Sequence, residues 1–288
     1  MSHEPDIVSR INNFYGQLRD AEQKIARLIL DDISFAAQAS ISELARKAKV
    51  SEATITRFAK AVECKNVRHL KLCLAQAEAV GDRFYTDVKA EPRGIYSVYE
   101  DIKAILDHNA GLLTEAVVDP AVETLAKARQ ILIFGVGGGS TVMAQECQHR
   151  FFRLGFPATA YSDPMLMRMA ASTIDSSDVV MCLSLGGYSP DVEEAAAIAK
   201  EYGAELVGVT VADSPLGALL DHLVPIETME TDYIFKPSAS RYAMLAAIDI
   251  LATELAAKHK RKSREALRRM KHTLDNHKHG RDRLPLGD

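Results

Sequence analysis

The stretch ISELARKAKVSEATITRFAK, residues 41–60, decides the fold of the first part of this chain. Ser40 precedes it and Glu43 follows three residues later, a capping box in which each side chain satisfies a free backbone amide at a helix start. Apolar residues then recur at the spacing of one buried helical face, at Ile41, Leu44, Ala45 and Ala48. The pattern predicts a short amphipathic helix.

A second helix is predicted after a tight turn. Ser51 is placed to cap it. Its apolar residues repeat the first spacing, at Ile55, Phe58, Ala59 and Val62. Val50 is the apolar residue of the turn, and Lys49 stands where glycine is common, so it must adopt the turn conformation with a side chain attached. Two such helices, over about residues 41–62, are typical of a helix-turn-helix, which binds duplex DNA.

The outer face of the second helix carries the candidate DNA contacts. They are Ser51, Glu52, Ala53, Thr54, Thr56, Arg57 and Lys60. Residues 41–71 hold eight Lys or Arg against three acids, and this surplus suits contacts with phosphates. An ordinary helical hairpin with solvated charges is the alternative interpretation.

Length and charge indicate two domains with different surfaces. The chain has 288 residues, is 47% hydrophobic and carries a net charge of -4. Residues 1–80 hold 12 basic and 10 acidic groups, residues 95–255 hold 9 and 22, and residues 256–288 hold 11 and 4. The acidic middle is poorly suited to lying on DNA, whereas the two ends are not.

Several classes are not expected. No run of 18 apolar residues occurs, and the first residues lack a basic region followed by an apolar one, so we expect neither secretion nor a membrane span. The four cysteines have neither CxxC spacing nor metal-like clustering with histidine: Cys64, Cys73, Cys147 and Cys182. We therefore expect reduced thiols in a cytoplasmic protein.

The first domain is predicted to be all-helical over residues 1–80. Helices at 7–18 and 21–30 precede the helix-turn-helix, and one at 67–79 follows it. Residues 81–94 have no clear periodicity and contain Pro and Gly, so they are expected to form a linker. One long helix is then predicted at 95–118, and a short one at 120–128 with Pro120 in its first turn.

Short β-rich runs alternate with helices from residue 130 onward. The predicted strands cover 131–135, 158–161, 179–184, 205–210 and 222–225. The predicted helices between them cover 141–154, 164–171, 190–202 and 215–220. This alternation predicts a doubly wound parallel sheet with helices on both faces, within an α/β domain over residues 95–257. A final helix of about thirty residues is expected from Ser240 into the basic tail.

Two loops after strands are candidate ligand sites, because ligands bind such sheets at the carboxyl ends of the strands. The first loop reads GVGGGS over residues 135–140, and the second reads SLGGYS over residues 184–189. Their candidate ligand contacts are Gly137, Gly138, Gly139, Ser140, Ser184, Gly186, Gly187 and Ser189. Hydroxyls and free amides without a Walker lysine suit a single phosphate.

Two other interpretations of these loops stay open. A glycine-rich turn between strand and helix can serve tight packing alone. Gly135, Gly137 and Ser140 also approximate GxGxxG, and Asp163 follows the second strand where a dinucleotide ribose acceptor would be. A dinucleotide would not require the serines of the second loop.

The acidic domain resembles an SIS (sugar isomerase) domain. An SIS domain that follows a helical unit containing SELARKAKVSEATITRF is similar to the arrangement in the RpiR family of bacterial transcriptional regulators. The run AQECQHRFFRLG at 144–155 and the segments Ser240-Arg241 and Ile248-Asp249 also carry the resemblance. It is strongest to the subgroup that controls hexose and central carbon metabolism in pseudomonads.

The resemblance implies DNA binding modulated by a phosphorylated sugar or sugar acid, with 2-keto-3-deoxy-6-phosphogluconate as the leading effector and no other cofactor. It implies effector contacts at Ser140, Ser184 and Arg241, and a DNA contact at Arg57. SIS loops usually carry hydroxyls at the positions of Gly139 and Gly186, so this chain departs from the family pattern there.

An isomerase is the enzymatic alternative, because SIS domains also occur in aldose-ketose isomerases. The available acid-base groups have simpler explanations, because they lie on a partly exposed helix face or in an acidic loop. Catalysis is therefore not expected. They are Glu146, His149, Glu230, Asp232 and Arg241.

We expect a homodimer or tetramer, joined through its SIS domains, that presents paired helix-turn-helices to a palindromic operator in double-stranded DNA. The basic run KHKRKSREALRRMKH at 258–272 is interpreted as a solvated helix end, with a second DNA contact as the alternative. Disorder is expected after His277.

Overall fold

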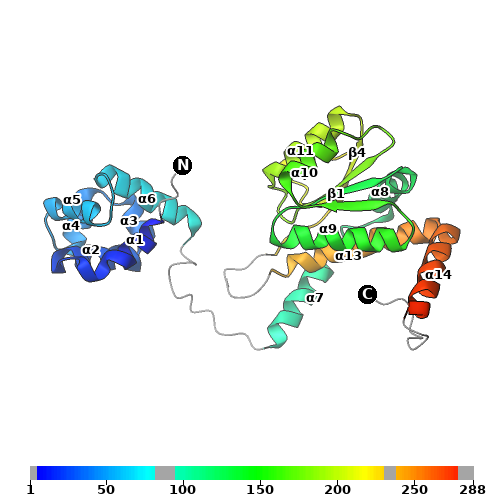
Figure 1. The fold of residues 1–288 in the computed structure, drawn as a ribbon. Coiled ribbons are helices and arrows are strands. Elements are labelled where there is room, and N and C mark those ends of the chain that lie inside the picture. The colour runs from blue at the N-terminus through cyan, green and yellow to red at the C-terminus, as the bar shows by residue number, and fades with distance from the viewer. Residues whose placement is uncertain (1–4, 82–94, 230–237, 278–288) are drawn as a thin grey trace. The chain divides into compact units, whose positions relative to one another are not determined.

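The computed structural model describes residues 5–81, 95–229 and 238–277. The chain divides into two compact units, a helical one at the N-terminal end and an α/β one (Figure 1). Among the described helices, none is both long and apolar enough to cross a membrane. The predicted linker lies almost wholly outside the described residues, as does the tail beyond His277.

The helical unit contains six α-helices and one short 3-10 helix within its described residues. They are α1 (Ile7–Phe14), η1 (Tyr15–Gln17), α2 (Asp20–Asp31), α3 (Ile33–Gln38), α4 (Ile41–Ala48), α5 (Glu52–Ala61) and α6 (Val67–Val80). The predicted first helix ends early, and α3 was not predicted. Asp32 begins α3 by accepting a hydrogen bond from the amide of Phe35, 2.9 Å away, so one short polar residue separates α2 from α3.

The core of this unit joins all its helices around Ile25, Leu44, Ile55, Phe58 and Leu70, each fully buried. The prediction of a buried face on α4 and α5 is therefore confirmed except at Ile41, which is 37% exposed. Ile41 is the first residue of α4, where the outer end of the helix extends past the core.

The α/β unit begins with two helices, α7 (Tyr96–Ala110) and α8 (Glu115–Lys127). The single helix predicted at 95–118 is wrong, since the chain breaks at residues 111–114 and Thr114 starts a new helix. Pro120 consequently lies inside α8 rather than in its first turn. The break lets α8 turn back and pack on β4 and β5.

A parallel sheet of five strands follows, in the order β2-β1-β3-β4-β5. The strands are β1 (Ile131–Phe134), β2 (Ala158–Tyr161), β3 (Val179–Leu183), β4 (Glu205–Thr210) and β5 (His222–Pro225). The helices that alternate with them are α9 (Gly138–Arg153), α10 (Pro164–Ala171), α11 (Pro190–Glu201) and α12 (Pro215–Leu219). The predicted α/β architecture and doubly wound sheet are confirmed.

Both faces of the sheet are covered. Ile131 and Ile133 of β1 pack with α8, α9 and α13 (Ser240–Lys258), whereas Leu132 and Phe134 pack with α10, α11 and α12. Figure 1 shows these two helical layers on opposite sides of the strands. Strands buried on both faces explain the continuous apolar runs of the sequence.

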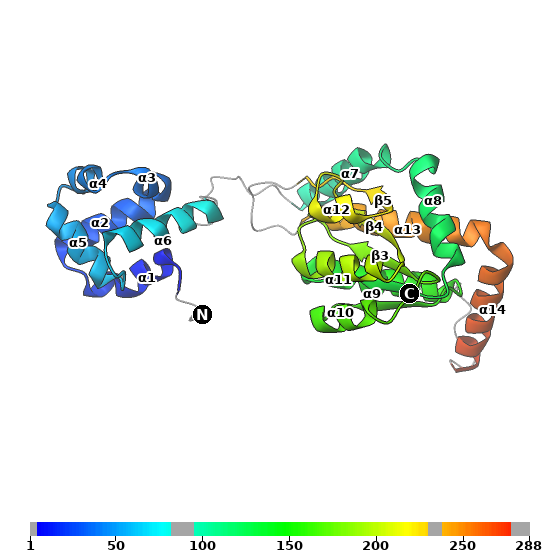
Figure 2. The same cartoon turned by 90° about the horizontal axis from the view of Figure 1, so that it is seen from above.

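The C-terminal region forms two helices instead of one. α13 ends at Lys258, and α14 (Lys260–His277) leaves in a new direction (Figures 1 and 2). The turn brings Lys262 over the ring of Phe156, with its Nζ 4.0 Å from the ring centroid, and the rings of Phe156 and His259 meet edge-on. The basic run is mostly exposed, but one face of it folds back on the end of α9.

Candidate functional site

The turn between α4 and α5 has the geometry that the sequence predicted. Ser40 and Glu43 form the capping box of α4. Lys49 then adopts the left-handed conformation, with φ 56° and ψ 47°, and its amide and that of Val50 return to the end of α4. Ser51 accepts a hydrogen bond from the amide of Thr54 and caps α5.

The predicted DNA contacts on α5 are exposed with one exception. Ser51, Glu52, Thr56, Arg57 and Lys60 face solvent, as does Ala53. Thr54 is only 5% exposed, so its placement on the outer face was wrong. The helical period places Thr54 beside the buried Ile55 and Phe58 rather than with the exposed residues of α5.

Thr54 instead supports its neighbours. Its hydroxyl lies 2.9 Å from Ser51 Oγ and accepts a hydrogen bond of 3.1 Å from Nη2 of Arg57. This bond holds one terminal nitrogen of the Arg57 guanidinium, Nη2, against the start of α5. A restrained arginine loses less side-chain entropy when it contacts a phosphate or a guanine.

The basic surplus around the helix-turn-helix is smaller than the sequence count. Lys47 lies 3.5 Å above the ring centroid of Phe35 and pairs with Asp32. Lys71 donates to backbone carbonyls at the end of α3, including that of Ala36 at 2.8 Å. Burial lowers the pKa of Lys71. Lys47 stays exposed despite these contacts, and the other exposed basic side chains are Arg46, Lys49, Arg57, Lys60, Lys65 and Arg68.

The two predicted effector loops lie side by side in the α/β unit. β1 and β3 are paired parallel neighbours, so the loops that follow them leave the same edge of the sheet. A Cβ atom on Gly139 of the first loop would lie 3.2 Å from Leu185 Cδ1 of the second. The structure therefore brings together the two loops that the sequence singled out.

The hydroxyls of both loops are largely covered by protein. Ser140 is 8% exposed and Ser184 is 6% exposed. Ser184 Oγ accepts a hydrogen bond of 3.1 Å from the amide of Gly187, while the amide of Ser189 donates to Glu193 at 2.8 Å. Fewer amides of the second loop are free than the sequence suggested. The bond from Gly187 leaves the Ser184 hydroxyl proton available to a phosphate oxygen.

Free amides are instead concentrated at the start of α9. The N-cap of α9 is Gly137, with φ 93° and no side-chain cap. The first helical amides, from Gly138 to Ser140, have no acceptor within the helix and carry the positive end of its dipole. A phosphate beside them would be bound by amides of one loop and the hydroxyl of the other.

Gly186 and Gly187 have opposite environments. A Cβ atom on Gly186 would meet nothing within 4 Å. Gly187 has φ 71°, and its Cβ would lie 2.1 Å from Ser214 Oγ at the start of α12. Gly187 is thus required by backbone and packing, whereas Gly186 leaves open space where related loops carry a hydroxyl.

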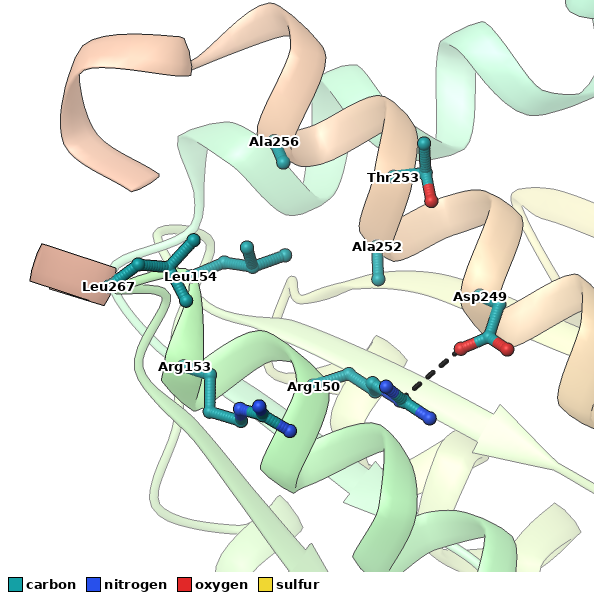
Figure 3. Close-up of a pocket in the computed structure, with 8 residues that line it drawn as sticks. All are labelled: Arg150, Arg153, Leu154, Asp249, Ala252, Thr253, Ala256 and Leu267. Carbon is teal, nitrogen blue, oxygen red and sulfur yellow. Dashed lines mark ion pairs between the residues drawn. The ribbon is translucent and has the colours of Figure 1, made fainter. Parts of the chain in front are cut away.

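Arg241, the remaining predicted effector contact, is exposed on the first turn of α13, with its guanidinium 5.1 Å from the ring centroid of Tyr242. Arg150 of α9 pairs with Asp249 of α13 at 3.2 Å. Figure 3 shows α9 running from Arg150 to Arg153 in the same direction as α13 runs from Asp249 to Ala256, so the two helices are parallel and begin toward the same edge of the sheet. Arg241 is therefore at the correct edge, although the contact it makes is with Tyr242.

The groups for the enzymatic and dinucleotide alternatives have structural roles where they are described. Glu146 pairs with Arg150 at 2.7 Å, and His149 is exposed on α9. Asp163 caps α10, its Oδ1 accepting a hydrogen bond of 2.8 Å from the amide of Leu166, so the residue has a structural role at this helix start. Glu230 and Asp232 lie outside the described residues.

A cavity of about 510 Å³ lies at the opposite end of α9, and the sequence did not indicate it (Figure 3). Side chains of α9, α13 and α14 line it. They are Arg150, Arg153, Leu154, Asp249, Ala252, Thr253, Ala256 and Leu267. The bend after α13 brings Leu267 of α14 to this cavity, and the single predicted helix concealed that bend.

The four cysteines are thiols rather than disulfides, as the sequence predicted, but the sequence did not indicate that two of them lie beside a histidine. All four are free and buried, but Cys64, His69 and Cys73 come together with their sulfur and nitrogen atoms within 4.8 Å of one another. Cys64 lies in the turn after α5, and the other two lie one turn apart on α6. The spacing His-x3-Cys on a helix was the signal that could have indicated this cluster.

Comparisons with known proteins agree with this architecture. Residues 6–81 match the helix-turn-helix domain of the rpiR family, and residues 124–254 match the SIS domain. A helix-turn-helix domain followed by an SIS domain defines a class of transcriptional regulators.

The chain belongs to the RpiR family of these regulators. It is 34% identical over 273 residues to the HTH-type transcriptional regulator HexR of Pseudomonas aeruginosa, covering 93% of this chain and 95% of the relative. It is 30% identical over 287 residues to HexR of Escherichia coli, covering 98% and 99%.

Among solved structures, the Vibrio vulnificus NanR protein complexed with ManNAc-6P is similar to this chain. The TM-score is 0.60 and the sequence identity 20%, over 93% of this chain and 98% of the other. At this identity the likeness supports the fold.

Proposed function

We propose that this regulator binds a palindromic operator through α5 and that a phosphorylated sugar acid in the SIS domain controls this binding. The observation that supports it most is the pairing of the two serine-bearing loops, with buried Ser140 and Ser184 beside the free amides of α9. We assign the protein to the cytoplasm, where its DNA and its effector occur together.

The DNA part of the proposal rests on the surface of α5. Arg57 is exposed, with Nη2 of its guanidinium held by Thr54, and Ser51 caps the helix that would enter the groove. Lys49 and Lys60 are exposed nearby and suit phosphates on either side. Two copies in a homodimer would read two half-sites about one helical turn apart.

The effector part rests on the chemistry of the loops. Amides, hydroxyls and a helix start can neutralise one phosphate without a lysine. The Vibrio NanR structure contains a phosphorylated sugar in the same fold. By its similarity to HexR, this chain is proposed to take 2-keto-3-deoxy-6-phosphogluconate, with Arg241 as the candidate partner of its carboxylate.

The effector must bind one arrangement of the paired DNA-binding domains more tightly than another, since only differential affinity can move such an equilibrium. Repression that is relieved by the effector is the version we propose. No other cofactor and no catalytic step are required.

A gel-shift with DNA from upstream of the neighbouring genes tests the proposal. The full chain should shift a palindromic fragment, and a panel of sugar phosphates should include one that releases it. Inorganic phosphate serves as the control. Release by no member of the panel would contradict the sensor assignment, and turnover of a panel member would support the isomerase alternative.

A further inference from the structure

The cluster of Cys64, His69 and Cys73 lies in the helical unit, whereas the two candidate effector loops belong to the α/β unit. Cys64 is 3% exposed and follows Glu63, which adopts a left-handed conformation with φ 61° at the end of α5. Cys73 is 9% exposed and lies one helical turn after His69 on α6. The cluster therefore connects the end of α5 to the middle of α6.

Two nitrogen groups point at the sulfur of Cys73. Nη2 of Arg10, a residue only 3% exposed, donates to Sγ at 3.1 Å, and Nη1 of the same side chain donates to the carbonyl of Glu63 at 3.3 Å. Nε2 of His69 lies 3.6 Å from the same sulfur.

The tautomer of His69 follows from its other nitrogen. The amide of Lys65 donates to Nδ1 of His69 at 3.2 Å, so Nδ1 is the acceptor and Nε2 carries the proton. Cys73 Sγ thus receives N–H donors from both a guanidinium and an imidazole. These N–H donors, one of them on a cation, create the electropositive setting in which reactive cysteines are found.

The same geometry opposes a metal ion at this place. A metal on Nε2 would require that nitrogen to lose its proton, and the amide of Lys65 already occupies Nδ1. The Arg10 cation also lies where a metal bound to Cys73 would repel it. Thiol chemistry therefore fits the cluster better than metal binding.

A cavity of about 200 Å³ reaches Cys73 from outside. Arg10, His69 and Cys73 border it together with residues of α1 and the end of α6. This volume admits a small oxidant such as a hydroperoxide. The buried thiols of the α/β unit differ, because burial raises the pKa of Cys147 and raises that of Cys182 to about 12.

We propose that Cys73 is an oxidation site for small hydroperoxides and that Cys64 is its resolving partner. Cys73 Sγ attacks the terminal oxygen of ROOH, the S–O bond forms and the O–O bond breaks, and the alkoxide leaves as ROH with the proton that the thiol loses. Sulfur is oxidised and the peroxide is reduced. The Cys64 thiol then attacks Cys73 Sγ as it loses its proton, an S–S bond forms, and hydroxide leaves with that proton as water.

The disulfide would couple this chemistry to α5. Pulling the Cys64 and Cys73 sulfurs from their present separation to a bond length draws the turn after α5 toward α6. This part rests on the proposed function of α5. We expect the oxidised protein to bind operator DNA about tenfold more weakly, and reductant to restore binding.

The chemistry is tested without DNA. The full-length reduced protein is treated with stoichiometric hydrogen peroxide, alkylated with iodoacetamide and mapped by mass spectrometry. Cys64 and Cys73 should become protected as a disulfide while Cys147 and Cys182 stay reduced. Cys64→Ser should stop at a sulfenic acid on Cys73, trapped by dimedone, and Cys73→Ser should form no adduct at Cys64.

His69→Gln keeps a partly exposed polar side chain and should slow oxidation about tenfold. Cys182→Ala is the matched control and should leave the rate unchanged. Circular dichroism verifies that each variant is folded. The proposal is overturned if Cys73 oxidises no faster than Cys147, or if the purified protein holds a stoichiometric zinc ion that peroxide releases. Failure of the unoxidised protein to bind any DNA would count against the function of α5 alone.

Discussion

The helical unit and the α/β unit differ in which residues adopt a left-handed backbone conformation. In the described part of the α/β unit every left-handed position is a glycine: Gly137, Gly155, Gly187 and Gly203. In the helical unit the two positions that flank α5 are Lys49, with φ 56°, and Glu63, with φ 61°. A side chain at positive φ costs about 1 kcal/mol relative to glycine.

One ion pair from each unit also differs in burial. In the α/β unit the Asp178 carboxylate is fully buried and receives two hydrogen bonds from Arg129, at 2.9 and 2.6 Å. In the helical unit Lys47 and Asp32 form a pair in which both side chains are 46% exposed. In the α/β unit, glycines and a buried ion pair fit the turns to close packing. In the helical unit, charged side chains stay exposed on the surface that we assign to DNA.

Gly187→Ala should destabilise the α/β unit by about 3 kcal/mol, from positive φ together with overpacking against Ser214. Gly186→Ala is the matched control, since its Cβ enters open space. Urea denaturation followed by circular dichroism measures both. Equal stability of the two variants would contradict the environments that we assign to these glycines.

Asp178→Asn should lower the free energy of unfolding by about 2 kcal/mol at neutral pH, the scale of charged hydrogen bonds to a half-exposed arginine. Hydrogen bonds from Arg129 lower the pKa of Asp178 below its ordinary value of 3.8. The pair therefore stabilises the fold above pH 3.8, and this contribution falls as the pH drops toward the folded-state pKa. Lys47→Gln is the exposed control and should cost less than about 1 kcal/mol.

Stability of the wild type and the Asp178→Asn variant should converge on acidification. Denaturation curves from pH 7 down to pH 3 measure this. A difference that stays constant over the range would exclude the ionised pair as its source.

Arg57→Ala should weaken operator binding by about 1.5 kcal/mol, roughly tenfold, with little effect on stability. Its guanidinium is exposed and held by one bond to Thr54, so the fold does not depend on it. Fluorescence anisotropy with a labelled operator measures the affinity. Lys47→Gln should change it less, because that ammonium already lies on Phe35.

Lys49→Gly should stabilise the helical unit by about 0.5–1 kcal/mol, since glycine relieves the left-handed strain and loses part of that gain to chain entropy. The same variant should weaken DNA binding slightly if Lys49 contacts a phosphate. Thermal unfolding and anisotropy measure the two effects. Destabilisation would mean that the side chain of Lys49 stabilises the turn in a way that its exposure does not indicate.

Local signals accounted for most of the fold. Each of these signals spans only a few residues of sequence. They are the capping box of Ser40, the apolar runs of the strands, and Pro164 and Pro190 at helix starts, and the elements they predict are confirmed. The errors lie where distant contacts decide. The break before α8 and the bend after Lys258 depend on packing against β5 and Phe156, which no local pattern specifies.

The candidate site divides in the same way. The adjacency of the two loops followed from strand order, because parallel neighbours end at one edge. Three observations depend on side-chain directions and on how helices cross. Thr54 is buried, the Gly187 amide donates to Ser184, and Cys64 lies close to Cys73. Sequence spacing alone does not fix these.

The central claim is that the loops of the SIS domain sense a sugar phosphate and that α5 reports it. Operator binding by the wild type, Ser184→Ala and Arg57→Ala, each measured by anisotropy while 2-keto-3-deoxy-6-phosphogluconate is added, tests this most directly. We predict that the effector releases the wild type, that Ser184→Ala binds DNA normally but responds about tenfold less sensitively, and that Arg57→Ala loses DNA affinity. An unchanged effector response in Ser184→Ala would contradict the account.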